Sequence, residues 1–489
     1  MPGVALIDGK RSVSFTEASA LIERVAAHLR AAGAGPGQVV SWQLPNWWEA
    51  AIIHHAILHA GAIPNPLNAI FRERELRHVL AEARPSIVFV PERFRGFDAA
   101  ATVRAVRPDA TVVVVRGSGS PSLGQWLSEP ASLEAEPRAD HAPALLLYTS
   151  GTTSDPKGVV HTHASLAAEV ASLEAVHAIT PSDRYLGGSP VTHIAGLVYG
   201  VLMPFVLGTA TVLLERWDPD AAVEAIERDG ATFMTGAPVF LQTLAAHVAK
   251  PPVGGFRLFS TGGGVIDTTM VQDAEAALGC TVKRAYGSTE MPTLTATAFD
   301  DPPSIRLGTD GRVIGEAEMR IVRDGRDVPA GEEGEIWARG PELFAGYRNA
   351  ALDETVFEDG WFKTGDLGTV DGAGILRVTG RLGDIIIRAG ENISVTEVEA
   401  LIATHPAVAE VAVVGMPDAA VGERACAFVV PRPGATLTLE SLVAHLASLK
   451  IAKQKFPERL EIRDSLPQTA SGKTARAALR AELLREPSN

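Results

Sequence analysis

The chain has 489 residues, of which 46% are hydrophobic, and its formal net charge is −14. This length exceeds what one ordinary core organises, so we expect about two or three domains. An acidic balance without a long Lys/Arg run argues against nucleic acid or an anionic membrane as the main partner. We find no signal-peptide pattern and no apolar run of membrane-spanning length, so we expect no membrane insertion. Cys280 and Cys426 lack metal-ligand spacing, which favours unpaired thiols in a reducing cytoplasm.

Short apolar strands alternate with alanine-rich helices along much of the chain, a pattern typical of layered α/β structure. The expected elements are a helix over 16–32, a strand over 39–44, a helix over 47–60, and strands over 87–90, 111–115 and 144–147. Residues 117–138, rich in Gly, Pro and Ser, are expected to form a connector. Glycine-punctuated short strands between 305 and 380 predict a small β subdomain. The remainder predicts a compact unit with a strand over 411–414 and a helix over 439–449.

Residues 148–158 read Tyr-Thr-Ser-Gly-Thr-Thr-Ser-Asp-Pro-Lys-Gly and directly follow an apolar strand. Such a loop offers backbone N–H groups, hydroxyl donors and one cation to a polyphosphate. It is not a Walker A loop, because glycine rather than serine or threonine follows Lys157. A flexible surface turn is the alternative interpretation of this loop taken alone.

Two glycine-rich segments could border a ligand. His193 lies in the apolar stretch 189–196, although a buried histidine with satisfied hydrogen bonds explains it at least as well. Gly262, Gly263 and Gly264 follow an apolar strand, where bare backbone would let a flat ring or an acyl chain approach closely. A simple tight turn is the alternative for these glycines.

Three polar segments could supply charge to a site. Residues 286–290 combine an aromatic ring, hydroxyls and the carboxylate of Glu290, which could hold Mg²⁺ or simply be solvated. Asp366 follows a glycine turn and is suited to accept hydrogen bonds from a ribose diol. Lys473 lies on a small-residue loop, where most lysines are surface charges. The pair His161 and His163 has a conceivable metal spacing, but helix-start and packing roles are favoured because no third ligand is nearby.

In their order and spacing, these motifs resemble the adenylate-forming superfamily of acyl-CoA synthetases, aryl-CoA ligases, peptide-synthetase adenylation domains and beetle luciferases. The resemblance covers nearly the whole chain and includes 148–158, 286–290, 334–366, 380–384 and 472–473. It implies an α/β fold with a large N-terminal domain over 1–382, built of layered α/β subdomains and the β subdomain at about 305–380. A small mobile α+β C-terminal domain over 383–489 would carry Lys473.

The resemblance implies a reaction in two halves that uses ATP, Mg²⁺ and CoA. A carboxylate attacks the α-phosphorus of ATP to give an acyl-adenylate and pyrophosphate, and a thiol then displaces AMP. The implied catalytic residues are Lys473, Lys157, Thr289 and Glu290, with Glu290 as the Mg²⁺ ligand. The implied ATP- and AMP-binding residues are Thr149, Ser150, Gly151, Thr152, Thr153, Lys157, Gly263, Gly264, Tyr286, Gly287, Thr289, Asp366, Arg381 and Lys473. The implied acyl pocket comprises His193, Gly196, Gly262, Gly263 and Met291.

In this family the small C-terminal domain rotates between the half-reactions, so Lys473 would serve adenylation only. Arg388, Gly390 and Glu391 would then line the tunnel for CoA. Two departures from the family pattern stand out. Ser154 replaces a usual glycine of the phosphate loop, and Gly383 occupies the hinge position that is often aspartate or lysine.

Residues 189–201 contain no aspartate that could pair with a substrate amine, so a hydrophobic acid is expected rather than an α-amino acid. One alternative is an enzyme that passes its acyl-adenylate to a carrier protein or a partner ligase. A second alternative is a non-catalytic nucleotide sensor, which the intact charged motif residues oppose. A homodimer is left open.

Overall fold

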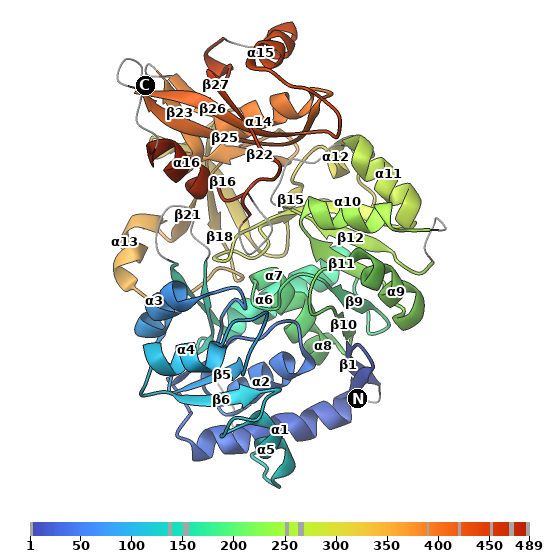
Figure 1. Ribbon diagram of the computed structural model, residues 1–489, viewed down its shortest axis with the longest axis vertical. Coiled ribbons are helices and arrows are strands. Elements are labelled where there is room, and N and C mark those ends of the chain that lie inside the picture. Colours follow the sequence, from blue (N-terminus) through green and yellow to red (C-terminus); the bar gives the residue numbers. More distant parts are fainter. Residues whose placement is uncertain are drawn as a thin grey trace. The chain divides into compact units, whose positions relative to one another are not determined.

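The structure is a computed structural model that describes residues 3–134, 139–149, 156–249, 254–262, 268–388, 391–418, 422–449, 453–468 and 474–485. Compactness divides the chain into two units, whose elements are labelled in Figure 1. The first comprises Met1–Gly151, Asp155–Glu318 and Ala338–Gly360, and the second Thr152–Ser154, Met319–Trp337 and Trp361–Asn489. The second unit thus contains much of the expected β subdomain, and the domain boundary at 382 stays a prediction.

A nine-stranded sheet is the largest sheet of the first unit, with the order β15-β14-β13-β12-β11-β9-β10-β1-β2. Its strands are β1 Val4–Asp8, β2 Arg11–Ser14, β9 Arg184–Gly187, β10 Ala210–Leu213, β11 Phe233–Gly236, β12 Leu258–Thr261, β13 Thr281–Tyr286, β14 Thr295–Ala296 and β15 Arg312–Val313. A parallel four-stranded sheet, β4-β3-β5-β6, contains β3 Val39–Trp42, β4 Ile63–Pro66, β5 Ile87–Pro91 and β6 Thr111–Val115.

The first unit also contains fifteen described helical segments. They are α1 Phe15–Ala31, α2 Trp48–His59, α3 Glu73–Ala83, α4 Ala99–Val106, α5 Leu123–Ser128, α6 His163–His177, α7 Ile194–Leu197, the π-helix η1 Val198–Leu202, α8 Met203–Leu207, α9 Pro219–Asp229, α10 Pro238–Ala246, α11 Thr268–Leu278, α12 Pro303–Arg306, the 3₁₀-helix η2 Ala350–Leu352 and α13 Asp353–Val356.

Alternation along the strands sorts the apolar side chains into layers. Leu186, Met234 and Phe259 pack with α9, α10 and α11 in one core, and Figure 1 shows these three helices in green beside the large sheet. The neighbouring residues Tyr185 and Phe233 point the other way, into the core that α1, α2, α6 and η1 share with the four-stranded sheet. Helices α3 and α4 cover the far face of the four-stranded sheet.

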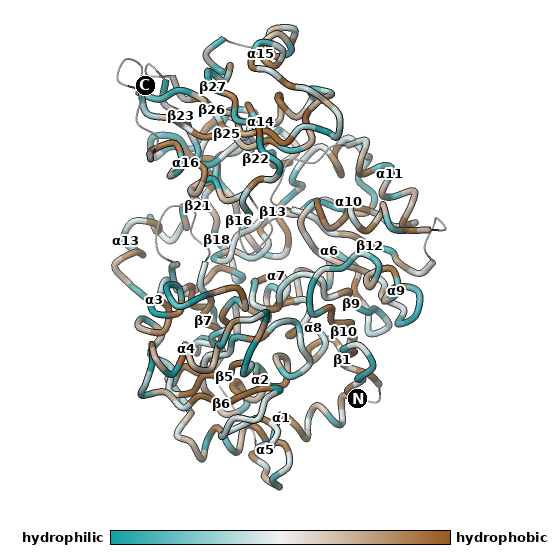
Figure 2. Tube along the Cα trace, in the orientation of Figure 1, coloured by the Kyte–Doolittle hydropathy of each residue, from teal (hydrophilic) through white to brown (hydrophobic). Residues whose placement is uncertain are grey.

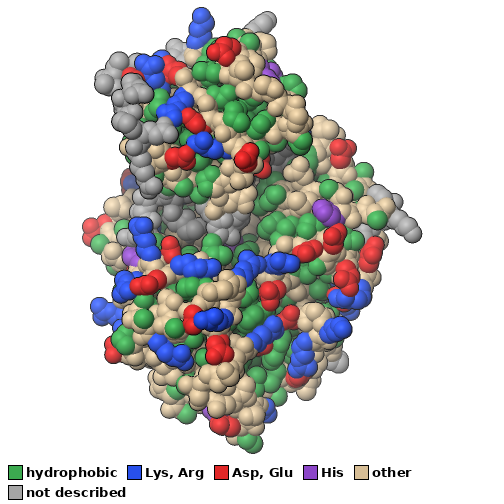
Figure 3. Space-filling model, in the orientation of Figure 1, with side chains coloured by type: hydrophobic (Ala, Val, Ile, Leu, Met, Phe, Trp, Pro, Cys, Tyr) green, Lys and Arg blue, Asp and Glu red, His purple; other side chains and the backbone are tan. Residues whose placement is uncertain are grey.

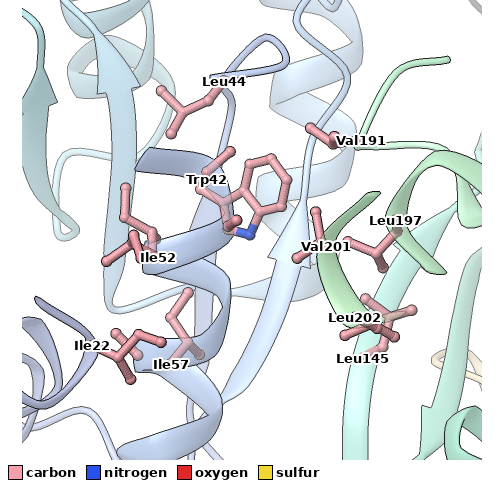
Figure 4. Packing of buried hydrophobic residues seen from close by; sticks show 14 of the residues in the cluster. Ile22, Trp42, Leu44, Ile52, Ile57, Leu145, Val191, Leu197, Val201 and Leu202 are labelled. Carbon is pink, nitrogen blue, oxygen red and sulfur yellow. The ribbon is translucent and has the colours of Figure 1, made fainter. Parts of the chain in front are cut away.

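Trp42 lies at the centre of the core between the two sheets and is fully buried. Figure 4 shows its indole among Leu44, Ile52 and Val191, which come from the segment after β3, from α2 and from the turn before α7. Helix α2 is apolar on nearly all sides, as expected for a helix enclosed between sheets. Strands β5 and β6 are correspondingly brown in the hydropathy view of Figure 2.

A small antiparallel sheet, β19-β8-β7, completes the first unit. It contains β7 Pro143–Tyr148, β8 Gly158–Thr162 and β19 Gly346–Tyr347. Thr162 ends β8 and caps α6, because its hydroxyl accepts the N–H of Ser165 at 3.0 Å. This sheet therefore carries both ends of the expected phosphate loop and places them beside Tyr347.

The second unit contains most of a six-stranded sheet and a five-stranded sheet. The first has β16 Glu318–Arg323, β17 Arg326–Asp327, β18 Glu333–Arg339, β20 Phe357–Glu358, β21 Trp361–Val370 and β22 Leu376–Arg381. The second has β23 Ile385–Arg388, β24 Glu391–Ser394, β25 Val408–Asp418, β26 Gly422–Pro431 and β27 Arg459–Ile462. The helices around it are α14 Val395–Ala403, α15 Leu439–Ser448 and α16 Arg476–Arg485. Its connections contain the 3₁₀-helices η3 Leu382–Asp384 and η4 Lys453–Lys455.

The two faces of the β25–β26 pair form separate cores. Val413 and Ala427 pack with α14 and α15 on one face, whereas Val414 and Phe428 pack with α16 on the other. The two sheets of this unit are also linked, because the Ser394 hydroxyl donates to the Thr379 carbonyl at 2.8 Å.

The expected helices and strands are present, but the structure corrects the predictions for the connector over 117–138 and for the position of Asp366. The connector over 117–138 includes the helix α5, which begins with a capping box at Ser122. Asp366 lies inside the ten-residue strand β21, where it pairs with Arg381 of β22, although Gly365 before it has a left-handed φ of +72°. Among the described residues, no helix is long and apolar enough to cross a membrane.

Candidate active site

Four parallel strands of the large sheet, β9, β11, β12 and β13, are neighbours and end at a common edge. Ligands of open α/β sheets bind beyond the carboxyl ends of such strands. The segments that follow them contain the predicted residues: 188–196 after β9, Gly262 after β12, and 286–291 at the end of β13. Three predicted motifs therefore meet at one edge of one sheet.

Close backbone packing explains the glycines at this edge. A Cβ added at Gly262 would lie 2.3 Å from the Ala285 carbonyl oxygen on the neighbouring strand. A Cβ at Gly196, in α7, would lie 2.1 Å from the Pro190 carbonyl oxygen. His193 precedes α7 as its N-cap residue, and Met291 is buried with 1% exposure.

Residues 286–291 form a tight, internally bonded turn. The Ser288 hydroxyl accepts the N–H groups of both Glu290 and Met291 at 3.2 Å. The Ser288 N–H in turn donates to the Met291 carbonyl at 2.8 Å, and a Cβ at Gly287 would lie 2.1 Å from the Pro292 carbonyl oxygen. These contacts fix the backbone that carries Thr289 and Glu290.

The small sheet joins this turn to the phosphate loop through Tyr347. The Tyr347 hydroxyl donates to Glu290 Oε1 at 2.7 Å. Lys157 Nζ lies 5.5 Å from the centroid of the same ring, within cation–π range. The Phe344 N–H also donates to the Glu290 carbonyl at 2.9 Å. A carboxylate and a cation predicted from separate motifs thus contact one tyrosine.

His161 holds the same turn from β8. Its Nε2 lies 2.8 Å from the Thr289 carbonyl oxygen, and its Nδ1 lies 3.1 Å from the Ser165 hydroxyl. Since a carbonyl only accepts hydrogen bonds, the Nε2 atom carries the proton and the Nδ1 atom accepts. Burial lowers the pKa of His161 to about 4, so the ring is neutral at pH 7.

Helix α6 contacts the segments that carry Thr293 and Glu342 through two buried side chains, Glu169 and Ser172. The Thr293 hydroxyl donates to Glu169 at 2.7 Å, and the Ser172 hydroxyl donates to Glu342 at 2.6 Å. Burial, together with a smaller effect of the nearby Glu342, raises the pKa of Glu169 to about 8. Glu169 is therefore mainly protonated at pH 7 and acts as a structural hydrogen-bonding group.

The base of the phosphate loop is formed by a reciprocal contact. The Thr149 N–H donates to the Lys157 carbonyl at 3.0 Å, and the Lys157 N–H reaches the Thr149 hydroxyl at 3.4 Å. Eight predicted site residues lie outside the described residues: Ser150, Gly151, Thr152, Thr153, Gly263, Gly264, Gly390 and Lys473. Ser154, the departure from the family loop, lies outside them as well.

The second unit contains the remaining predicted site residues. Asp366 and Arg381 are paired residues of β21 and β22, and Arg381 Nε lies 3.3 Å from Asp366 Oδ1. Gly383 lies in η3, and Glu391 begins β24. Arg388, at the end of β23, donates to Glu458 at 2.8 Å.

Sequence reasoning missed the positioning contacts of Tyr347 and His161. Tyr347 was part of the matched signature, but nothing in its spacing indicates a contact with Glu290, which lies 57 residues away. His161 was interpreted as a packing residue, and its partner Thr289 lies 128 residues away. The one sequence feature that links His161 to the site is its place on β8, which begins directly after Lys157.

Comparison with known proteins identifies the family. Residues 3–348 match the model of the AMP-binding enzymes, and residues 397–473 match the model of the AMP-binding enzyme C-terminal domain. The chain belongs to this family. It is 34% identical to the medium-chain fatty-acid–CoA ligase of Escherichia coli (strain K12), with 99% of this chain and 88% of that protein covered.

Two further similarities extend this result. The chain is 33% identical to the indoleacetate–CoA ligase of Aromatoleum aromaticum (strain DSM 19018 / LMG 30748 / EbN1), with 98% of this chain and 94% of that protein covered. The crystal structure of ATP-bound MatB from Rhodopseudomonas palustris superposes with a TM-score of 0.90 at 29% identity, covering 98% of this chain and 95% of that chain. The adenylate-forming resemblance and the mixed α/β fold with a smaller C-terminal part are confirmed.

This family member is an AMP-forming acid–thiol ligase that uses ATP, Mg²⁺ and CoA and proceeds through an acyl-adenylate. The comparisons do not favour a carrier protein as the thiol donor in place of CoA. The donor set fits Mg²⁺, which prefers one or two carboxylates together with substrate phosphates over a cage of protein ligands. Glu290 offers one half-buried carboxylate beside the phosphate loop, and the described residues contain no group of three metal-ligating side chains.

Proposed function

We propose that the acid activated by this ligase is hydrophobic and carries no charged group besides its carboxylate. The supporting observation is the edge at which β9, β11, β12 and β13 end. In the described segments 188–196, 236–240 and 262, which follow β9, β11 and β12, His193 is the one ionisable side chain, and the carboxylate that follows β13, Glu290, is assigned to Mg²⁺. A second charge on the acid would lose its hydration there without gaining a partner.

Pyrophosphate exchange with matched acids tests this substrate class. Hexanoate and cyclohexanecarboxylate should support exchange, whereas adipate and 6-aminohexanoate of similar length should react at least about tenfold more slowly. Equal exchange with the charged acids would contradict an uncharged pocket. Adding CoA to the best acid should then release AMP and acyl-CoA.

We propose the following division of roles in adenylation. The carboxylate of the acid attacks the α-phosphorus, and both reactants are negatively charged, so local cations and hydrogen-bond donors have to offset the repulsion. Thr149, Lys157 and the intervening loop would hold the phosphates, and Thr289 would contact the α-phosphate. Mg²⁺ bound at Glu290 would neutralise phosphate charge. Figure 3 shows Lys/Arg and Asp/Glu side chains interspersed over the visible face, so that face offers no broad positive patch to offset the phosphate charge.

The family resemblance also implies roles in binding the nucleoside and the thiol. Tyr286 would pack on adenine, and the adjacent Asp366 and Arg381 would hold the ribose. Gly263 and Gly264 would border adenine, and His193, Gly196, Gly262 and Met291 would border the acyl chain. Arg388, Gly390 and Glu391 would line the CoA tunnel, and Gly383 would be the hinge. Free thiols at the buried Cys280 and Cys426 support the cytoplasm as the compartment.

Lys473 is expected to serve the first half-reaction only. Lys473→Ala should lower pyrophosphate exchange by about 10²–10³-fold, because one charge-stabilising contact is lost, while transfer from preformed acyl-adenylate to CoA persists. The exposed Lys453 supplies a control, since Lys453→Ala should leave both half-reactions unchanged. Equal loss of both half-reactions in the Lys473 variant would contradict a lysine that acts in one state.

A further inference from the structure

The contacts of Tyr347 define a positioning role that extends the proposed function and rests on it. Its side chain is 7% exposed and touches two groups of the site at once. The hydroxyl donates to Glu290 Oε1 at 2.7 Å, and the ring faces Lys157 Nζ at 5.5 Å from its centroid. The hydroxyl and the ring therefore make separate contacts, so a substitution can remove the hydroxyl contact and keep the ring contact.

The surroundings of Tyr347 hold the ring in one place. Its own N–H donates to Asp353 Oδ1 at 2.8 Å. Phe344 packs edge-on against it, with ring centroids 5.0 Å apart and an interplanar angle of 68°. A Cβ at Gly346, whose φ is +132°, would lie 2.6 Å from Asp353 Oδ2, so the strand position before the tyrosine requires glycine. The ring is thus fixed before any nucleotide arrives.

The backbone supports the same arrangement. Tyr347 of β19 pairs with Val159 of β8, and Lys157 lies two residues before Val159. The lysine and the tyrosine therefore lie close together on adjacent chain segments. The carbonyl of Glu290 is held by the Phe344 N–H, three residues before Tyr347. Glu290 would act on the metal ion and Lys157 on the phosphates of the same ligand. The backbone around Tyr347 therefore supports both groups.

We propose that Tyr347 is a positioning residue that presents Glu290 and Lys157 to Mg²⁺·ATP as one pre-arranged unit. The hydroxyl holds the Glu290 carboxylate in the orientation that meets the metal ion. The ring gives the Lys157 ammonium group a fixed position over its face. Pre-arrangement lowers the ordering cost that the nucleotide would otherwise meet on binding.

Calorimetric titration separates the two contributions without any need for the acid substrate. Tyr347→Phe keeps the ring and removes the hydroxyl, so we expect the Kd for Mg²⁺·ATP to rise about tenfold, as for loss of a hydrogen bond to a charged group. The Kd for ATP in EDTA should not change. Tyr347→Leu removes both contacts and should weaken binding about threefold further, with and without the metal.

Two controls make the result specific. Tyr199→Phe removes a buried hydroxyl in the core between the sheets and should bind Mg²⁺·ATP as the wild type does. Adding Tyr347→Phe to Glu290→Gln should cause no further loss of Mg²⁺·ATP affinity, because the hydroxyl acts through that carboxylate. Unchanged thermal melting would show that the variants are folded.

Three outcomes would overturn the role of Tyr347, and a fourth would overturn only the proposed substrate class. A Tyr347→Phe variant that loses affinity equally with and without Mg²⁺ would show a general structural role, and additive losses with Glu290→Gln would show that the hydroxyl acts elsewhere. If the wild type bound Mg²⁺·ATP but exchanged pyrophosphate only with charged acids, the proposed substrate class alone would fail. A wild type that bound no Mg²⁺·ATP would overturn both the role of Tyr347 and the proposed division of site roles.

Discussion

His161 is a buried imidazole that uses both ring nitrogens in hydrogen bonds. Its neutral state has a consequence for stability. The unfolded chain binds a proton at this ring below about pH 6.5, whereas the folded chain does so only near the lowered pKa of about 4. The unfolded state therefore binds more protons between these values, and stability falls as the pH is lowered through this window.

Replacement of His161 by glutamine tests this effect. A pKa of about 4 implies that His161 alone removes about 2 kcal/mol of unfolding free energy between pH 7 and pH 5. Because glutamine does not titrate, His161→Gln should show a smaller loss in urea unfolding followed by tryptophan fluorescence. The exposed His141 is the control, since His141→Gln should keep the wild-type dependence. An unchanged dependence in His161→Gln would show that this ring is not the titrating group.

At the scale of an element, α6 combines a capped start with a buried acidic face. Thr162 caps its first turn, and Glu169 and Ser172 reach the segments that carry Thr293 and Glu342. The raised pKa of Glu169 means that the folded protein binds more protons than the unfolded chain between about pH 4.5 and 8. Its contribution to stability is therefore largest at low pH and is lost as the pH rises.

Glu169→Gln should consequently stabilise the protein, and more strongly at higher pH. Glutamine keeps an acceptor for the Thr293 hydroxyl but never ionises, so its advantage over the wild type should grow by about 2 kcal/mol between pH 6 and pH 8. Urea unfolding at the two pH values measures this difference. Glu174→Gln, on the exposed face of the same helix, should show no such growth. A Glu169→Gln variant less stable than the wild type at pH 8 would contradict a protonated Glu169.

At the scale of the molecule, the second unit is held together by ionic contacts as well as by its cores. Arg476, at the start of α16, donates to Glu399 of α14 at 2.5 Å and to Asp384 beside Gly383 at 3.3 Å. Burial raises the pKa of Glu399 despite the arginine, so this carboxylate depends on its partner. Two helices and the proposed hinge region therefore share one arginine.

Arg476→Met should destabilise the second unit by about 3 kcal/mol, because Glu399 would remain buried without a cationic partner. Arg480→Met, on the same helix, removes an exposed pair with Glu423 and should cost under about 1 kcal/mol. Thermal unfolding followed by circular dichroism compares the two variants. Similar melting temperatures for both would show that the Arg476 contacts contribute little.

The amino-acid sequence by itself determined the layered α/β pattern, the order of the motifs and the family. Each of these depends on local periodicity or on residues close together in the chain, such as the helix that ends before Gly33 and the loop over 148–158. It also singled out the segments that follow β9, β12 and β13, which the structure places at one edge of the large sheet because parallel strands bring their carboxyl ends together.

Only the tertiary structure decided which side chains meet across the chain. The contacts of Tyr347 with Glu290 and of His161 with Thr289 join residues 57 and 128 positions apart. The same holds for the pairing that extends β21 through Asp366 and for the burial that keeps Glu169 protonated. Such contacts depend on how sheets and helices pack, and no periodicity along the chain encodes them.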